Sequence, residues 1–290
     1  MTLPDFLVIG VPRAGTTWLH EALSAHPEVG VPRRRKELHF FDRNFSRGTA
    51  WYASYFEGLA GHRRIGEVTP GYLYVEDLAA RIESVPSIRQ LVVVLRDPVE
   101  RLVSHYRWRV RQDGFRGDLK AFLEAYPEAL DWGDYARHLE RLGGWIRSGR
   151  LLVLSHEAMH APGSAELERL ASFLEVSGDP FRETGSEPVN VSRPPRSRWL
   201  WKGGVRLARW LRDRRLDRLV NALRPAAGLL LDKRKSIERP PDPTLVAWIE
   251  DHYRSRLAGL DDLAGRNLTA EWPWFDVPAD RRACGERAGA

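Results

Sequence analysis

Residues 5–19 read DFLVIGVPRAGTTWL. The apolar run at 6–9 is typical of a buried strand, and the turn between Gly10 and Gly15 leads into a helical pattern that begins at Thr16. A strand, a glycine-bounded loop and a helix N-terminus form an anion cradle, because backbone N–H groups converge there and the helix dipole favours negative charge. This stretch therefore predicts a P-loop-like phosphate-binding loop between a strand and a helix.

The loop differs from a nucleotide P-loop, G-x-x-x-x-G-K-[ST], at one decisive position. Gly10 and Gly15 have the required spacing, but Thr16 stands where the lysine belongs, followed by Thr17 at the Ser/Thr position. The cation within the loop is Arg13. A nucleoside-triphosphate enzyme needs that lysine on the β- and γ-phosphates, so the sequence favours a phosphate site without the triphosphate apparatus. A strand–helix turn that binds no ligand is the alternative interpretation.

A second buried strand places another arginine at the same edge of the sheet. Residues 91–98 read LVVVLRDP, and such an apolar, valine-rich run is typical of a parallel sheet. Ligands in open α/β sheets bind at the carboxyl ends of strands, so Arg96 is expected at the site, with Ser104 about two turns into the next helix. An arginine there suits a phosphate monoester. Alternatively, Arg96 is a surface residue paired with a neighbouring carboxylate.

Four further motifs accompany these two. Residues 36–42 read KELHFFD, 67–72 read EVTPGY, 190–198 read NVSRPPRSR and 263–268 read LAGRNL. In this order, the motifs resemble those of sulfotransferases that use 3′-phosphoadenosine 5′-phosphosulfate (PAPS), in particular bacterial relatives of the heparan sulfate O-sulfotransferases. The resemblance covers residues 5–275.

The resemblance and the predicted alternation of strands with helices imply the same fold. We expect an α/β three-layer sandwich around a parallel sheet of about five strands, with helices on both faces. One domain is expected over residues 1–276, and the tail at 277–290 is predicted to be disordered because it is small, charged and aperiodic. Strands are expected at 5–9, 64–68, 90–95 and 151–155, helices at 16–25, 75–83, 98–111, 121–126, 135–148 and 164–174, and irregular structure at 27–60.

The resemblance also implies a PAPS site. The loop would hold the 5′-phosphosulfate, Arg96 and Ser104 would bind the 3′-phosphate, and Arg196 would close over the cofactor. Arg13, where many sulfotransferases have lysine, resembles the loop of tyrosylprotein sulfotransferases and would act by charge alone, since a guanidinium does not give up its proton. No metal is required, because the sulfuryl group is already activated. The implied cofactor-binding residues are Arg13, Ala14, Gly15, Thr16, Thr17, Trp18, Arg96, Ser104, Arg193, Arg196 and Ser197.

Sulfuryl transfer needs a general base, because the acceptor hydroxyl must lose its proton. The resemblance assigns that role to Glu37, and the basic run at 33–36 favours its ionised form. His39 is the next catalytic candidate, as a base or as a group that orients Glu37 or the substrate, and Asp42 would anchor the segment. The alternatives are that Glu37 only balances the basic run and that His39 is structural.

The acceptor is less well defined by the sequence. Val68 stands where relatives with Glu-Lys-Thr-Pro have an active-site lysine, so heparan specificity is not carried over, and the role of Glu67 stays open. The acceptor would be a hydroxyl-bearing sugar, glycolipid or metabolite. Trp132 and Trp145 are expected in the core. Other aromatic residues either line an acceptor cleft or belong to the core; they are Trp51, Tyr52, Tyr55, Phe56, Tyr72, Tyr74 and Trp108.

Composition is consistent with one cytoplasmic enzyme domain. The chain has 290 residues, 43% of them hydrophobic, which suffices for the core of one large α/β domain. Its apolar runs fall well short of the ~20 residues of a membrane-spanning helix, and no signal-peptide pattern precedes the first strand. The single cysteine, Cys284, excludes a disulfide within the chain.

The net charge of +6 is unevenly distributed, because residues 193–239 contain 15 Lys or Arg and four Asp or Glu. Helical spacing over 199–223 predicts a basic, tryptophan-containing helix. This segment is expected to be a lid over anionic ligands, a peripheral membrane contact or simply a solvated face. No nucleic-acid recognition motif accompanies the charge, so no nucleic-acid partner is predicted.

Two alternative functions stay open. The first is a P-loop-type nucleotide kinase or phosphotransferase, against which Thr16 in place of lysine argues. The second is a non-catalytic polyanion-binding protein, which would tolerate the loss of Glu37.

Overall fold

The computed structural model describes residues 1–33, 35–161, 164–182 and 240–276, together with residues 203, 204, 207, 208, 211 and 219. Almost all of the predicted basic lid at 193–239 therefore lies outside the described residues, as do the tail at 277–290 and Cys284. The same holds for three predicted cofactor-binding residues, Arg193, Arg196 and Ser197.

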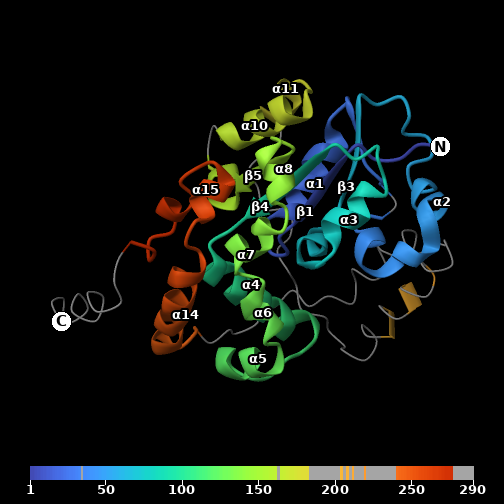
Figure 1. The fold of residues 1–290 in the computed structure, drawn as a ribbon. Coiled ribbons are helices and arrows are strands. Elements are labelled where there is room, and N and C mark those ends of the chain that lie inside the picture. The colour runs from blue at the N-terminus through green and yellow to red at the C-terminus, as the bar shows by residue number, and fades with distance from the viewer. Residues whose placement is uncertain are drawn as a thin grey trace.

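The centre of the fold is a parallel five-stranded sheet in the order β2-β3-β1-β4-β5 (Figure 1). This confirms the predicted fold class. The four predicted strands lie within one residue of their expected bounds, whereas β2 was not predicted because it is only two residues long. The strands are β1 (Phe6–Gly10), β2 (Val29–Gly30), β3 (Arg64–Val68), β4 (Gln90–Leu95) and β5 (Leu151–Ser155).

Helices cover both sides of the sheet (Figure 1). Those before β5 are α1 (Thr16–Ala25), α2 (Gly48–Ala53), α3 (Leu78–Glu83), α4 (Pro98–Gln112), α5 (Leu119–Ala125), α6 (Glu128–Asp131), α7 (Tyr135–Glu140) and α8 (Gly143–Arg147). Those after β5 are α9 (His156–Met159), α10 (Ala165–Leu174), α11 (Asp179–Arg182), α14 (Pro243–Arg256) and α15 (Leu260–Ala264). Short single-turn helices are η1 (Phe40–Asn44), η2 (Phe45–Arg47), η3 (Pro70–Tyr74) and η4 (Thr269–Glu271).

Three predicted helices were wrong in their bounds, and the stretch expected to be irregular at 27–60 contains β2 and α2. The helix expected at 121–126 is α5, which begins at Leu119 because Asp118 caps it. The helix expected at 135–148 is two helices, α7 and α8, because the backbone of Leu142 between them is not helical, with φ −103° and ψ 17°. The helix expected at 75–83 begins only at Leu78, because Val75 is extended after η3.

The core contains most of the aromatic residues whose place the sequence left open. Tyr52, Phe56 and Tyr72 have no exposed surface, and Trp51 is also buried. These four therefore belong to the core and do not line an acceptor cleft. Trp145 is buried as predicted, but Trp132 is only half-buried and stacks between Tyr74 and His105.

The segment after residue 240 returns to the strand ends near the predicted phosphate site. Helix α14 contacts α4, and the indole N–H of Trp274 donates to Asp97, the N-cap of α4, at 2.8 Å. Arg266 pairs with the buried Glu166 of α10 and with Glu271 of η4, which fixes the segment to α10. No helix in the described ranges is both long and apolar enough to cross a membrane.

Candidate active site

The predicted phosphate-binding loop joins β1 to α1 at the carboxyl end of the sheet. Gly15 precedes α1 with φ 77°, a left-handed conformation that favours glycine, and a Cβ there would lie 2.9 Å from Nδ1 of His156. Helix α1 has no side-chain cap and no acidic residue in its first turn. Its first N–H groups and its dipole are thus available to an anion.

The structure brings the two predicted phosphate-binding segments together. Nε of Arg13 donates to Oγ of Ser104 at 3.2 Å, and Nη1 of Arg96 donates to the carbonyl oxygen of Arg13 at 3.2 Å. Arg96 also pairs with Glu100 at 3.3 Å, so it is both at the site and ion-paired. Its Nε is buried without a hydrogen-bond partner among the described residues.

The electrostatics of this corner favour a bound anion. Burial lowers the pKa of Arg13 to about 10, and repulsion from Arg96 and Arg111 adds to the shift. Because these arginines repel one another in a partly desolvated corner, a bound anion would stabilise their charged forms.

The KELHFFD segment aligns three acidic and basic side chains. His39 lies between two carboxylates, with Nδ1 2.8 Å from Oδ2 of Asp42 and Nε2 3.4 Å from Oε2 of Glu37. Burial alone would lower the pKa of His39, but Asp42 and Glu37 outweigh burial and raise it. Burial would likewise raise the pKa of Glu37, yet contacts with His39 and Lys36 lower it. Glu37 is therefore ionised, and 42% of its side chain is exposed.

Lys36 connects this segment to the loop, and the sequence analysis missed it as a site residue. Its Nζ donates to Oγ1 of Thr17 at 2.9 Å and to Oγ1 of Thr16 at 3.4 Å, and lies 3.5 Å from Oε1 of Glu37. Two sequence features could have identified Lys36. It directly precedes Glu37, and the loop between Gly10 and Thr17 contains no lysine.

A fully buried carboxylate organises the backbone of the same segment. Oε1 of Glu67 accepts hydrogen bonds from the hydroxyls of Tyr52 at 2.6 Å and Tyr72 at 2.8 Å, and Oε2 accepts from Thr69 at 2.7 Å. Burial raises the pKa of Glu67, although the three hydroxyl donors oppose the shift. This network gives Glu67 a structural role, and the neighbouring Val68 is buried in the core.

The Glu67 network (Glu67, Tyr52, Tyr72 and Thr69) continues to the backbone on both sides of His39. The N–H of Leu38 donates to Oγ1 of Thr69 at 3.1 Å, and the N–H of Phe40 donates to the hydroxyl of Tyr72 at 2.7 Å. His39 itself has φ 54°, a conformation uncommon for a residue other than glycine. The buried carboxylate thus holds the backbone in the conformation that directs His39 toward Glu37.

Two histidines that the sequence analysis did not single out pack against the loop. The ring of His160 lies 5.0 Å from the ring of Trp18 and 4.7 Å from that of His156. Burial lowers the pKa of His156 to about 3, with repulsion from Arg96 adding to the shift, so this ring is neutral at pH 7. Trp18 is itself buried, and its contact with the predicted phosphate-binding loop is the ring packing with His160.

Comparison with known proteins decides the family. The sulfotransferase domain model matches residues 3–186, a range that contains the loop, the KELHFFD segment and Arg96. The chain belongs to the sulfotransferase family. Over 184 residues it is 34% identical to heparan sulfate glucosamine 3-O-sulfotransferase 3B1 of Mus musculus and 33% identical to the 3B1 protein of Homo sapiens. Each alignment covers 59% of this chain and 46% of the relative, so the chain spans less than half of either relative.

A solved structure shows the same fold. The sulfotransferase from Alicyclobacillus acidocaldarius superposes with a TM-score of 0.65 and 22% sequence identity, over 94% of this chain and 99% of that one. The α/β architecture is thus that of a sulfotransferase.

The raised pKa of His39 makes part of the stability of this protein pH dependent. A raised folded-state pKa stabilises the fold fully below the unfolded-state value of about 6.5, and this contribution is lost as pH rises through the folded-state pKa. We expect Asp42→Asn, which removes the strongest pKa-raising contact, to flatten the loss of thermal stability above about pH 6.5. Calorimetric melting of both proteins across this window measures the difference, and equal pH slopes would contradict the expectation.

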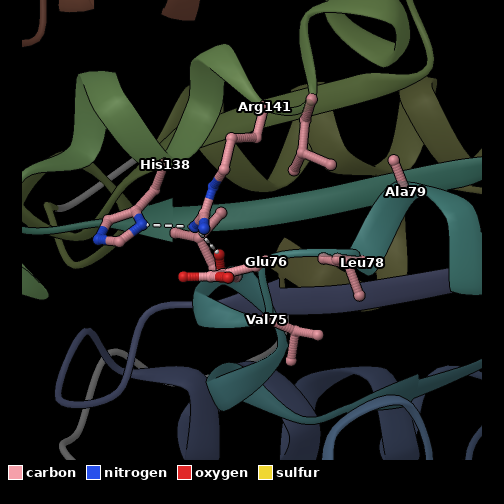
Figure 2. Close-up of a pocket in the computed structure, with 8 residues that line it drawn as sticks. Val75, Glu76, Leu78, Ala79, His138 and Arg141 are labelled. Carbon is pink, nitrogen blue, oxygen red and sulfur yellow. Dashed lines mark hydrogen bonds between the residues drawn. The ribbon is translucent and has the colours of Figure 1, made fainter.

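A small pocket elsewhere in the sulfotransferase fold contains none of these residues (Figure 2). Arg141 donates to Nδ1 of His138 at 2.6 Å and to the carbonyl oxygen of Leu73 at 2.9 Å. The pocket has room for about one water molecule. Burial lowers the pKa of His138 to about 4, so its ring is neutral and accepts a hydrogen bond from the charged Arg141, which joins α7 to η3.

Proposed function

We propose that this protein transfers the sulfuryl group of PAPS to a hydroxyl of a carbohydrate, glycolipid or small-molecule acceptor, with Glu37 as the general base. The observation that carries the proposal is the proximity of an ionised, partly exposed carboxylate to a phosphate cradle. Lys36 lies within 3.5 Å of both Glu37 and the threonine hydroxyls of the loop, so base and cradle share one site.

The cradle fits a bisphosphate nucleotide. The uncapped start of α1 and the hydroxyls of Thr16 and Thr17 suit the 5′-phosphosulfate, and Arg13 adds a fixed positive charge. The buried, unpartnered Nε of Arg96 supports a second anion beside Ser104, where the family resemblance puts the 3′-phosphate. When bound, PAPS supplies an activated sulfuryl group, whose bond to the 5′-phosphate breaks as the acceptor oxygen bonds to sulfur.

Residues of this chain would accept the proton, orient the base and stabilise the leaving group. Glu37, whose side chain is 42% exposed, accepts the proton of the acceptor hydroxyl. His39, held by Asp42, orients the Glu37 carboxylate and keeps it ionised. Arg13 stabilises the negative charge that grows on the leaving side, as fixed cations do in a partly desolvated site.

A carbohydrate is favoured among the acceptor classes because the relatives with which the chain aligns are named for a glucosamine residue of heparan sulfate. Heparan itself is not proposed, because the position of the family lysine is occupied by the fully buried Val68. Three members of the aromatic set, Tyr55, Tyr74 and Trp108, are half-buried and remain candidates for contact with an acceptor ring.

Calorimetric titration with adenosine 3′,5′-bisphosphate, compared with ATP and magnesium, tests the donor class. We expect metal-independent binding of the bisphosphate, weakened about 10- to 100-fold in Arg96→Ala because charge-assisted hydrogen bonds to phosphate are lost. Arg137→Ala, at an exposed position of α7, is the matched control and should bind as the wild type does. Preference for ATP with magnesium would favour a kinase, and binding of neither nucleotide would favour a polyanion-binding protein.

A further inference from the structure

Lys36 reaches the loop in which the sequence lacks a lysine. Its ammonium group contacts the hydroxyls of Thr16 and Thr17, the residues that open α1, and its side chain is only 20% exposed. Lys120 is the other lysine in the described part of the chain, and it lies exposed on α5. Lys36 is therefore the single ammonium group that the described residues bring to the cradle.

Neighbouring side chains are poorly suited to give up a proton there. Arg13 stays charged at neutral pH and does not act as an acid. Burial lowers the pKa of His20 to about 4 and that of His156 to about 3, so both rings are already neutral at pH 7. Burial also lowers the pKa of Lys36, with Arg13 adding to this effect and Glu37 opposing it, which makes its proton easier to transfer.

We propose that Lys36 is a catalytic residue that contacts the 5′-phosphosulfate and donates a proton to the leaving phosphate oxygen. This inference rests on the proposed sulfotransferase function. As the acceptor oxygen bonds to sulfur, the bond from sulfur to the phosphate oxygen breaks, and that oxygen takes a proton from Lys36. The acceptor proton goes to Glu37.

The contact between Lys36 and Glu37 lets the two groups exchange a proton after each transfer. After transfer, Lys36 is a neutral amine and Glu37 a neutral acid, 3.5 Å apart in the structure. The proton passes from Glu37 to Lys36 and restores both groups, so the acceptor hydroxyl ultimately supplies the proton that the bisphosphate product carries away. No external acid or base is consumed.

Two substitutions separate the charge of Lys36 from its acidity. Lys36→Arg keeps the positive charge but does not supply the proton, so we expect kcat to fall on the order of 10²-fold, with bisphosphate affinity within about threefold of the wild type. Lys36→Met removes the charge as well, and we expect a larger loss of kcat and about tenfold weaker bisphosphate binding. Lys120→Arg, on the exposed face of α5, is the matched control and should change neither quantity.

The pH profile distinguishes an acid from a merely structural lysine. A group that acts in its protonated form gives a rate that falls as pH rises through its pKa. We expect this alkaline limb of kcat in the wild type and in Lys120→Arg, and its absence in Lys36→Arg. Pulse labelling of amines, read by mass spectrometry, should also show Lys36 becoming protected by adenosine 3′,5′-bisphosphate, with Lys120 labelled equally in both states.

The outcomes for Lys36 and for the overall function are separable. A wild-type protein that binds no adenosine 3′,5′-bisphosphate would overturn the sulfotransferase proposal itself. A wild-type protein that transfers sulfuryl groups, with Lys36→Met keeping kcat within about threefold, would overturn the catalytic role of Lys36 alone. Full activity and an intact alkaline limb in Lys36→Arg would overturn proton donation.

Discussion

Glu37→Gln is expected to lower kcat for sulfuryl transfer by about 10³-fold, within the range that general-base catalysis contributes. The amide matches the carboxylate in size and still accepts hydrogen bonds from Lys36 and His39, but it does not take up the acceptor proton. Because neither substrate binding nor the loop depends on that proton, affinity for adenosine 3′,5′-bisphosphate should stay within about threefold. Initial rates at saturating donor and acceptor, with calorimetry of the bisphosphate, measure the two quantities separately.

The acid limb of the wild-type pH profile should report the same residue. Since His39 and Lys36 lower the pKa of Glu37, we expect activity to fall only as pH drops below the usual range of a glutamate. His39→Asn, which removes the principal pKa-lowering contact, should move that limb to higher pH. Glu57→Gln, at an exposed position beyond α2, is the control. Normal turnover by Glu37→Gln would transfer the role of base to His39.

The second large effect is expected on stability. Glu67→Ala should lower the free energy of unfolding by about 3–5 kcal/mol, because it leaves three buried hydroxyls without their acceptor and opens a cavity. For a chain of this size, the loss corresponds to a fall in Tm of roughly 5–15 °C. Thermal melts of Glu67→Ala and of Glu57→Ala, whose side chain is exposed, provide the comparison.

The Glu67 substitution should also change catalysis without changing the cradle. The network fixes the N–H groups of Leu38 and Phe40, so its loss frees the backbone that directs His39 toward Glu37. We expect folded Glu67→Gln to lose kcat by about 10-fold or more and to keep its bisphosphate affinity. Wild-type stability in Glu67→Ala would show that the buried hydroxyls find other partners.

Local sequence patterns predicted the framework of the site well. An apolar strand followed by a glycine-bounded turn is specified by neighbouring residues, so the β1–loop–α1 unit and the β4–α4 unit were found with their bounds. Parallel strands present their carboxyl ends at one edge, which is why Arg96 and Ser104 were expected beside Arg13, and the structure joins all three. The family resemblance, rather than any local pattern, supplied the role of Glu37.

Contacts between distant segments decided the rest. The sequence gives no measure of how far Lys36 lies from Thr17, or whether the hydroxyls of Tyr52 and Tyr72 turn toward Glu67, because both depend on how the irregular stretch at 27–60 packs on the sheet. Whether a side chain is buried likewise depends on how helices and sheet pack together. That packing places Tyr52, Phe56 and Tyr72 in the core. The sequence by itself thus predicted the fold class, the strand–loop–helix unit around Arg13 and the family resemblance. The tertiary structure alone determined the contact of Lys36 with Thr16 and Thr17 and the hydrogen bonds of the buried Glu67, because a side chain acquires its partners only once the chain has folded.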